Sequence, residues 1–152
     1  MPVTHLLDTS VYSQPIRKKP VQAAMDRWQS VGDTAVVTSV ICEAEVLFGI
    51  QNEKRRNSST KIDERYAALL KGKCDLLPVD YAVAEAYANL RADCEKNGTP
   101  VADMDLLIAA TALAHNLIVA TLNTNDFHVI PGVIVEDWSQ PLPPHEAAQA
   151  SQ

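Results

Sequence analysis

The sequence has no apolar run that approaches the roughly 20 residues needed to span a bilayer. Its first residues also lack the basic region and apolar stretch of a secretory signal. Cysteine is scarce: Cys42, Cys74 and Cys94 are odd in number and widely spaced, and no Cys/His spacing resembles a zinc site. These absences predict a cytoplasmic protein without a membrane segment, whose cysteines are reduced and buried.

Positively charged residues are also few. The chain has 13 lysines and arginines against 19 aspartates and glutamates, for a net charge of -6. This weighs mildly against a nucleic acid partner, because phosphate binding favours a basic surface. Two bound divalent cations would nevertheless bring the charge to about -2 and would place positive charge where a phosphate docks. The acidic composition therefore does not exclude a nuclease.

The 152 residues suit one domain with a substantial core. Apolar and β-branched runs predict five short strands, at residues 3–7, 35–38, 74–79, 118–121 and 133–135. Apolar residues at helical spacing predict five helices, near residues 21–28, 40–48, 62–70, 83–94 and 103–115. Two of these helices form a hairpin between the second and third strands. The alternation predicts an α/β fold with a mostly parallel sheet covered on both faces.

The composition changes after Trp138, where the chain becomes rich in proline, alanine and glutamine. We therefore predict one folded domain over residues 1–138 and a disordered tail over residues 139–152.

In an open parallel sheet, ligands bind at the carboxyl ends of the strands. The polar residues predicted at or beside those ends come from four parts of the chain. Asp8 directly follows the first strand, and Thr38 and Ser39 end the second. Asp103 and Asp105 open the last helix, and a further group follows the fourth strand, namely Thr121, Asn123 and Asp126. One such acid alone is often a turn or cap residue, and Asp126 has that alternative in particular.

Several acids at one edge call for another explanation. Crowded carboxylates repel one another, which is costly unless a cation lies among them. Oxygen ligands suit Mg²⁺ or Mn²⁺. Such an ion can activate water and stabilise the attacking and leaving oxygens of a phosphodiester. The pattern therefore favours metal-dependent hydrolysis.

Two pairs of acids require a choice. Glu43 and Glu45 lie two positions apart on one helix, about 200° around its axis, so they cannot both face one pocket. Gly49 would leave space beside Glu45, so we select Glu45 and expect Glu43 to be solvated. For the last helix we assign Asp103 as the N-cap and Asp105 as the metal ligand.

The complete pattern resembles the PIN domain. The segments that carry the resemblance occur in order over about residues 4–138 and are Leu6-Leu7-Asp8-Thr9-Ser10, Thr38-Ser39-Val40 with Glu45-Val46-Leu47-Phe48-Gly49, Asp105-Leu106-Leu107-Ile108-Ala109-Ala110, and Thr121-Leu122-Asn123-Thr124-Asn125-Asp126-Phe127. The closing Val135-Glu136-Asp137-Trp138 resembles the end of bacterial VapC- and FitB-like toxins.

The resemblance implies a three-layer α/β/α fold with a central five-stranded sheet. It also implies a Mg²⁺- or Mn²⁺-dependent endoribonuclease toxin that cleaves tRNA, rRNA or mRNA. Asp8 and Asp105 match the metal-binding aspartates, Glu45 matches the acid of the second helix, and Asp126 is the candidate for a variable fourth position with Asn123 beside it. Thr9, Ser10 and Thr121 match hydroxyl residues that position the acids or the water. The family implies a homodimer inhibited by a VapB-like antitoxin.

Two basic clusters, residues 17–19 and 54–56, are predicted in loops, where they would contact RNA or an antitoxin, or simply be solvated. The alternative to a nuclease is a non-catalytic PIN module that binds RNA or protein. A receiver domain fits poorly because only Asp8 follows the first strand, and a dehalogenase-like phosphatase fits poorly because Ser10 replaces the required second aspartate.

Overall fold

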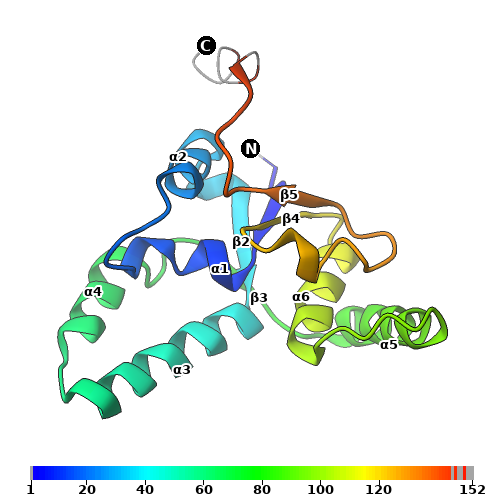
Figure 1. Cartoon of the computed structure of the whole chain (residues 1–152), viewed down its shortest axis with the longest axis horizontal. Coiled ribbons are helices and arrows are strands. Elements are labelled where there is room, and N and C mark those ends of the chain that lie inside the picture. Colours follow the sequence, from blue (N-terminus) through cyan, green and yellow to red (C-terminus); the bar gives the residue numbers. More distant parts are fainter. Residues whose placement is uncertain (1, 145, 147–148, 150–152) are drawn as a thin grey trace.

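A sheet of five parallel strands lies at the centre of the protein (Figure 1), in a computed structural model that describes residues 2–144, 146 and 149. The strands are β1 (His5–Leu7), β2 (Val36–Ser39), β3 (Asp75–Leu77), β4 (Ile118–Thr121) and β5 (Val135–Asp137). Their order is β3-β2-β1-β4-β5, and each neighbouring pair is parallel. The predicted five-stranded parallel sheet is confirmed.

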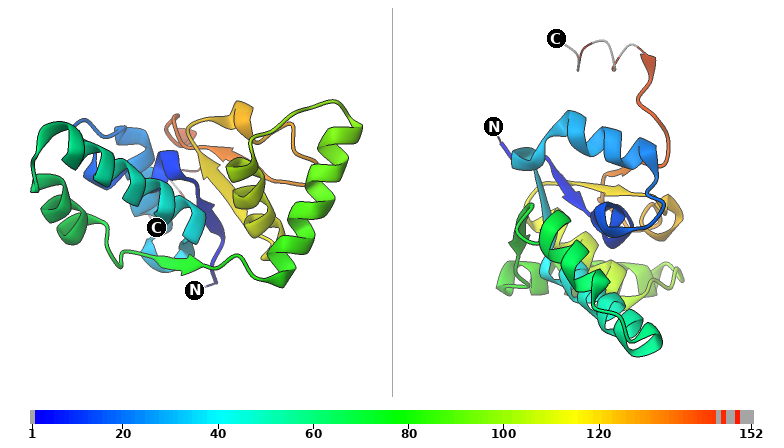
Figure 2. Two further views of the ribbon diagram at one scale, coloured as in Figure 1. Left: turned by 90° about the horizontal axis from the view of Figure 1, so that it is seen from below. Right: turned by 90° about the vertical axis from the view of Figure 1, so that its left-hand side faces the viewer.

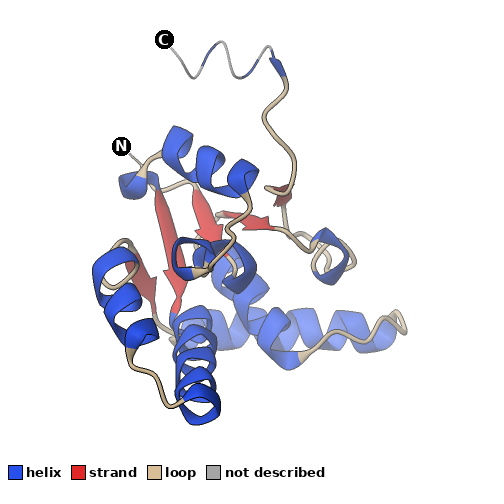
Figure 3. Cartoon of the chain, turned by 60° about the vertical axis from the view of Figure 1, so that its left-hand side comes forward, coloured by secondary structure: helices blue, strands red, loops and turns tan. Residues whose placement is uncertain are grey.

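Helices flank this sheet, as the alternating pattern predicted. They are α1 (Thr9–Tyr12), α2 (Gln22–Val31), α3 (Val40–Asn57), α4 (Lys61–Leu69), α5 (Tyr81–Lys96) and α6 (Asp103–Ala114), with 3-10 turns η1 (Gln14–Ile16), η2 (Asp33–Ala35) and η3 (Thr124–Asp126). Helix α2 lies on one side of the sheet and the α5–α6 pair on the other (Figure 2, right). Figure 3 shows the strands enclosed between these helical layers.

The central strand is apolar because both of its faces are covered. Leu6 and Leu7 of β1 are fully buried, and they pair with β2 on one side and β4 on the other. Continuous burial of this kind is typical of parallel sheets. Strand β3, at the edge, instead exposes Asp75 and Leu76. Asp8 follows β1 directly, so the first acid of the candidate site is attached to the central strand of the sheet.

Helix α3 differs from the prediction in its length and its buried face. It continues to Asn57, so Lys54, Arg55 and Arg56 lie in its last turn instead of a loop. Its residues beyond Ile50 are mostly polar, but they include strong helix formers. The apolar spacing of this helix, at Val40, Ala44, Leu47 and Phe48, predicted its buried face. The buried apolar positions are instead Cys42, Val46 and Ile50, and Leu47 and Phe48 are exposed, Phe48 to 71%.

Residues beyond β5 return to contact α2. The buried Arg27 of α2 donates from Nε to the carbonyl of Gln140 at 2.7 Å and from Nη2 to that of Pro141 at 3.3 Å. The domain boundary at residue 138 stays a prediction, and part of the predicted tail, at residues 145, 147–148 and 150–152, lies outside the described residues. No helix in the part of the chain that the structure describes is both long and apolar enough to cross a membrane.

Glu136 of β5 joins three segments of this region. Its carboxylate contacts His5 Nε2 at 3.3 Å and Arg27 Nη1 at 3.4 Å, and it accepts a hydrogen bond from Trp138 Nε1 at 2.8 Å. The hydrogen bond from His5, followed by that from Trp138 and the charges of His5 and Arg27, lowers the pKa of Glu136 from 4.5 to about 2 although burial opposes the shift. The ionised carboxylate therefore stabilises the folded state.

We expect Glu136→Gln to lower Tm by a few degrees near neutral pH. Because the folded pKa lies below the unfolded one, this stabilisation is complete above about pH 4.5 and is lost as the pH falls towards 2. Thermal unfolding followed by circular dichroism should show a Tm difference from wild type that narrows over that range. Glu85→Gln, at an exposed position on α5, is the control. A Glu136→Gln difference that stays constant with pH would contradict the prediction.

Candidate active site

The predicted acids lie at the carboxyl edge of the sheet, on four different elements. Asp8 follows β1, Glu45 lies in the second turn of α3, Asp105 in the first turn of α6, and Asp126 in η3 just after β4. Helix α3 contacts both α1 and α6, and α1 contacts β4 (Figure 1). Parallel strands present their carboxyl ends at one edge, so segments far apart in the sequence meet here.

Asp8 is held at both carboxylate oxygens. It is 5% exposed and caps α1, with Oδ1 accepting hydrogen bonds from Val11 N at 3.2 Å and Ser10 Oγ at 2.6 Å. Its Oδ2 accepts from Thr121 Oγ1 at 2.6 Å. Burial raises the pKa of Asp8, and these hydrogen bonds oppose the rise because they stabilise the carboxylate. The side chain is thereby fixed in one orientation.

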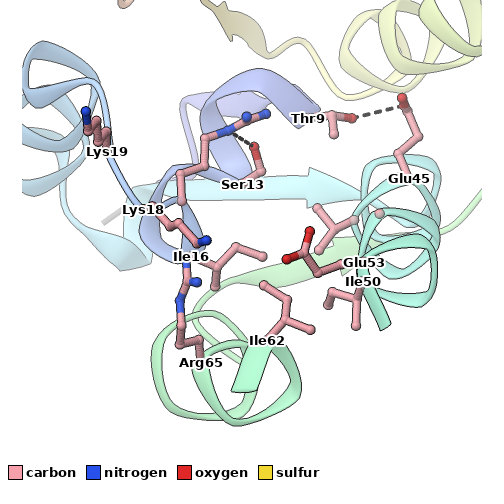
Figure 4. Close-up of a pocket in the computed structure, with 13 residues that line it drawn as sticks. Thr9, Ser13, Ile16, Lys18, Lys19, Glu45, Ile50, Glu53, Ile62 and Arg65 are labelled. Carbon is pink, nitrogen blue, oxygen red and sulfur yellow. Dashed lines mark hydrogen bonds between the residues drawn. The ribbon is translucent and has the colours of Figure 1, made fainter. Parts of the chain in front are cut away.

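Three hydroxyl groups connect the loops that carry the acids. Thr9 Oγ1 donates to Glu45 Oε1 at 2.9 Å (Figure 4), which links α1 to α3. Ser10 Oγ accepts from the backbone N of Leu122 at 3.0 Å, and Thr121 Oγ1 accepts from that of Asn123 at 2.9 Å. The Thr9, Ser10 and Thr121 hydroxyls thus support the carboxylates, the role that the resemblance implied for them.

The pKa of Asp105 is sensitive to the charges of the other three acids. Burial is the largest cause that raises its pKa, from 3.8 to about 6, and the negative charges of Asp126, Glu45 and Asp8 raise it further. Within the described residues, none of these four carboxylates forms an ion pair with a lysine, arginine or histidine. The edge of the sheet therefore carries negative charge that no basic side chain offsets.

This donor set suits a hard divalent cation. Its ligands are all oxygens, and their repulsion is relieved by a cation. Mg²⁺ commonly uses one or two carboxylates and keeps several waters, so it does not need a closed protein cage. Among the described residues, no three His, Cys, Asp or Glu side chains are arranged to hold a metal ion directly. The assignment of Asp8, Glu45 and Asp105 as ligands stays a prediction.

Asp103 is turned towards α5. It is exposed and accepts a hydrogen bond from Tyr87 Oη at 2.9 Å, and Arg91 Nη1 lies 3.4 Å from its carboxylate. The expectation that it caps α6 is wrong, because Ala102 occupies the N-cap position without a side-chain hydrogen bond. A neighbouring helix supplies partners for Asp103 that the sequence pattern does not reveal.

Glu43 is buried, so the expectation that it is solvated is also wrong. It is 7% exposed and accepts hydrogen bonds from Tyr12 Oη of α1, at 2.5 Å, and from Tyr66 Oη of α4. Burial, and then the hydrogen bond to the Glu43 carboxylate, raises the pKa of Tyr12 and raises that of Tyr66 to about 12. Both phenols therefore stay protonated. Helical periodicity does not reveal this cluster because its partners lie on other elements.

A groove of about 500 Å³ opens beside Glu45 and Thr9 (Figure 4). Two carboxylates of α3, Glu45 and Glu53, lie on this groove. Most of the other lining side chains are basic or apolar, and they include Arg17, Lys18, Lys19 and Arg65 together with Ile16, Val46, Ile50 and Ile62. The predicted cluster at residues 17–19 lies on this groove, but the one at residues 54–56 does not. Sequence reasoning missed Arg65, which belongs to α4 and no basic run.

Residues 5–133 match the PIN domain family. The chain is similar to the toxin FitB of Neisseria gonorrhoeae, with 33% identity over 137 residues that cover 88% of this chain and 97% of that protein. It is also similar to the tRNA(fMet)-specific endonuclease VapC of Shigella flexneri, with 28% identity over 137 residues, 88% of this chain and 97% of that one. The fold is similar to that in the DNA-bound VapBC structure from Salmonella typhimurium, with a TM-score of 0.75, 29% identity, and coverage of 90% of this chain and 98% of that chain.

The repulsion within the carboxylate cluster predicts that Asp105→Asn stabilises the metal-free protein. Because the folded pKa lies above 3.8, ionised Asp105 is unfavourable for folding, an effect that is absent below about pH 3.8 and complete above about pH 6. We expect Tm in EDTA to rise by a few degrees at about pH 7.5 and the gain to disappear near pH 4.

Asp103→Asn is the matched control, because it removes the same charge from the same helix turn but outside the cluster. It should not raise Tm. Equal Tm changes in both variants would indicate that the helix terminus, and not the cluster, is responsible.

Proposed function

The chain belongs to the PIN domain family, and on this basis we propose that it is a Mg²⁺- or Mn²⁺-dependent endoribonuclease that acts as the toxin of a toxin–antitoxin pair. Relatives named as ribonucleases and toxins support the activity and the biological role. The observation that carries the proposal is the meeting of Asp8, Glu45, Asp105 and Asp126 at the carboxyl edge of the sheet, where α3 contacts α1 and α6 and no described basic side chain pairs with these acids.

In this proposal Asp8, Glu45 and Asp105 would hold the cation together with the waters that it keeps, and Asp126 would add negative charge at the edge of the site. A bound divalent ion would supply a more acidic water and would stabilise the charge on the phosphate oxygens. The protein keeps the acids in place: Thr121 and Ser10 bind the two oxygens of Asp8, and Thr9 binds Glu45. Asn123, exposed after β4, is available to contact substrate.

The reaction is hydrolysis of an RNA phosphodiester to a 5′-phosphate and a 3′-hydroxyl. The cluster favours this chemistry because a divalent cation held by the carboxylates would offset their charge and would present a positive centre to the RNA phosphate. The substrate class is RNA, with tRNA, rRNA and mRNA as candidates. The name of the Shigella flexneri relative, a tRNA(fMet)-specific endonuclease, makes tRNA the first substrate to test.

The proposed protein partner is a VapB-like antitoxin that inhibits the enzyme. Structures of relatives in VapBC and FitAcB complexes support this proposal. A homodimer stays a prediction from the family resemblance. Cytoplasmic localisation stays a prediction as well.

The activity is tested by incubating the purified protein with mixed tRNA and Mn²⁺. We expect Asp8→Asn to lower the cleavage rate by at least about 100-fold, because it removes a ligand charge at the centre of the hydroxyl network. EDTA should abolish cleavage by the wild type. Asp103→Asn, whose carboxylate pairs with Tyr87 and Arg91, should retain activity.

Products separated on denaturing gels give the rate, and labelling after phosphatase treatment identifies the 5′-phosphate. Wild-type protein that binds RNA but leaves it intact with either metal would overturn the proposal in favour of a non-catalytic PIN module. Cleavage that survives both Asp8→Asn and EDTA would show that the nuclease does not use this cluster.

A further inference from the structure

The side chains that line the groove beside Glu45 indicate which ligand it binds. We propose that Arg17, Lys18, Lys19 and Arg65 bind the phosphates of single-stranded RNA on one side of the cleaved bond, an inference that rests on the proposed function. The cations come from two separate segments. Residues 17–19 follow η1, and Arg65 lies on α4, which packs against η1, so the basic groups gather on one side of the groove, opposite Glu45 and Glu53 of α3 (Figure 4).

These four cations are uncompensated. None of them forms an ion pair with a described carboxylate, and Arg17 makes only a neutral hydrogen bond from Nε to Ser13 Oγ at 3.2 Å. By contrast, Lys54 outside the groove binds Asp63 at 2.7 Å. The four cations also outnumber the two carboxylates of the groove, Glu45 and Glu53, so the groove is locally positive in a chain of net charge -6 and can bind an anion.

The groove leads into the carboxylate cluster. Glu45 and Thr9 line one end of it, and the same two residues are hydrogen-bonded to each other within the candidate active site. An RNA strand whose phosphates lie along the cations would therefore carry its next phosphodiester to the acids. This continuity favours substrate over an acidic peptide, which would not need to reach the cluster.

The lining also predicts how the RNA is recognised. The residues that line the groove include no aromatic side chain on which a base could stack, and the apolar ones are aliphatic, Ile16, Val46, Ile50 and Ile62. Base stacking on aromatic residues is the usual sequence-tolerant contribution in single-strand binding. Without it, phosphate contacts provide most of the affinity, so binding should depend strongly on salt and weakly on base sequence.

The test measures binding without catalysis, in the Asp8→Asn background, using a fluorescein-labelled oligouridine and fluorescence anisotropy over a range of KCl concentrations. Arg17→Gln/Arg65→Gln should raise Kd by about tenfold or more at low salt. The slope of log K against log [KCl] should decrease by about 0.7 for each phosphate that the variant no longer neutralises. The matched control is Arg55→Gln/Arg56→Gln, which removes the same charge from the last turn of α3 outside the groove.

If the two double variants raise the Kd for the oligouridine equally, the proposal is overturned, because RNA binding then depends only on net charge. RNA binding unchanged by the groove variants, together with abolished binding to an oligoglutamate peptide, would assign the groove to an acidic protein segment. Either result can occur while the wild type still cleaves RNA, so failure of the groove proposal is distinguishable from failure of the proposed function.

The buried Glu43 carries a second inference on separate evidence. We infer that the cluster of Tyr12, Glu43 and Tyr66 fixes α3 relative to α1 and thereby positions Glu45 against Asp8. Tyr12 is the last residue of α1, the helix that Asp8 caps, and Glu43 is two residues before Glu45 on α3. The Tyr12–Glu43 and Thr9–Glu45 hydrogen bonds therefore connect the same two helices at two points.

Tyr66 adds a third helix to this arrangement. It approaches the Glu43 carboxylate from α4, so each oxygen of Glu43 has a phenol partner, Tyr12 at Oε2 and Tyr66 at Oε1. No described cation pairs with Glu43, which makes the two phenols its principal support. A buried carboxylate that loses one donor must shift to find another, and a shift of α3 would move Glu45.

Tyr12→Phe and Glu43→Leu test this positioning role. We expect kcat for RNA cleavage to fall by about tenfold with KM unchanged, and the Kd for Mn²⁺, measured by titration calorimetry without RNA, to rise by a similar factor. Glu43→Gln keeps an acceptor for one phenol, so it should lose less kcat and less Mn²⁺ affinity than Glu43→Leu. Tyr81→Phe removes an 82% exposed phenol from α5 and should change neither quantity.

A purely structural role would give a different result. Tm would fall in Tyr12→Phe, while kcat and the Kd for Mn²⁺, measured well below Tm, would match wild type, and that outcome would overturn the inference. If Glu43→Leu does not fold, the milder Tyr12→Phe and Tyr66→Phe variants keep the test decisive.

Discussion

Electrostatic repulsion among four carboxylates is the constraint on which the rest of this structure depends. Asp8, Glu45, Asp105 and Asp126 come from distant parts of the chain, and their charges act together on Asp105. No described basic side chain pairs with them. The folded protein therefore maintains an unfavourable charge cluster that cation binding would relieve, and a cation bound only by the folded state would also stabilise it.

The fold can hold such a cluster because its supports are rigid. Asp8 continues from β1, which is the central strand, and Thr121 ends the neighbouring β4. The hydroxyls of Thr9, Ser10 and Thr121 stabilise the charged form of the acids without neutralising them. Polar contacts thus fix the directions of the carboxylates, while the apolar core fixes the elements that carry them.

Net charge alone is a poor guide to the partner of this protein. An excess of acids weighs against nucleic acid binding only if charges are spread evenly. Here the negative cluster lies next to a groove with unpaired cations at residues 17–19 and Arg65. Lys54, by contrast, is neutralised by Asp63 within the helical hairpin. The arrangement places opposite potentials side by side, which suits a polyanion that must also approach a bound cation.

The sequence by itself determined the parallel α/β sheet and the acids that follow its strands, because apolar runs and residues at strand ends are local features of the chain. Tertiary structure alone distinguished Glu43 from Glu45 and Asp103 from Asp105. Within each pair both residues lie on one helix two positions apart, and only partners from α1, α4 and α5 separate them. The same reason explains why the sequence did not reveal Arg65 as a groove residue: its place beside the basic loop follows from the packing of α4 against η1.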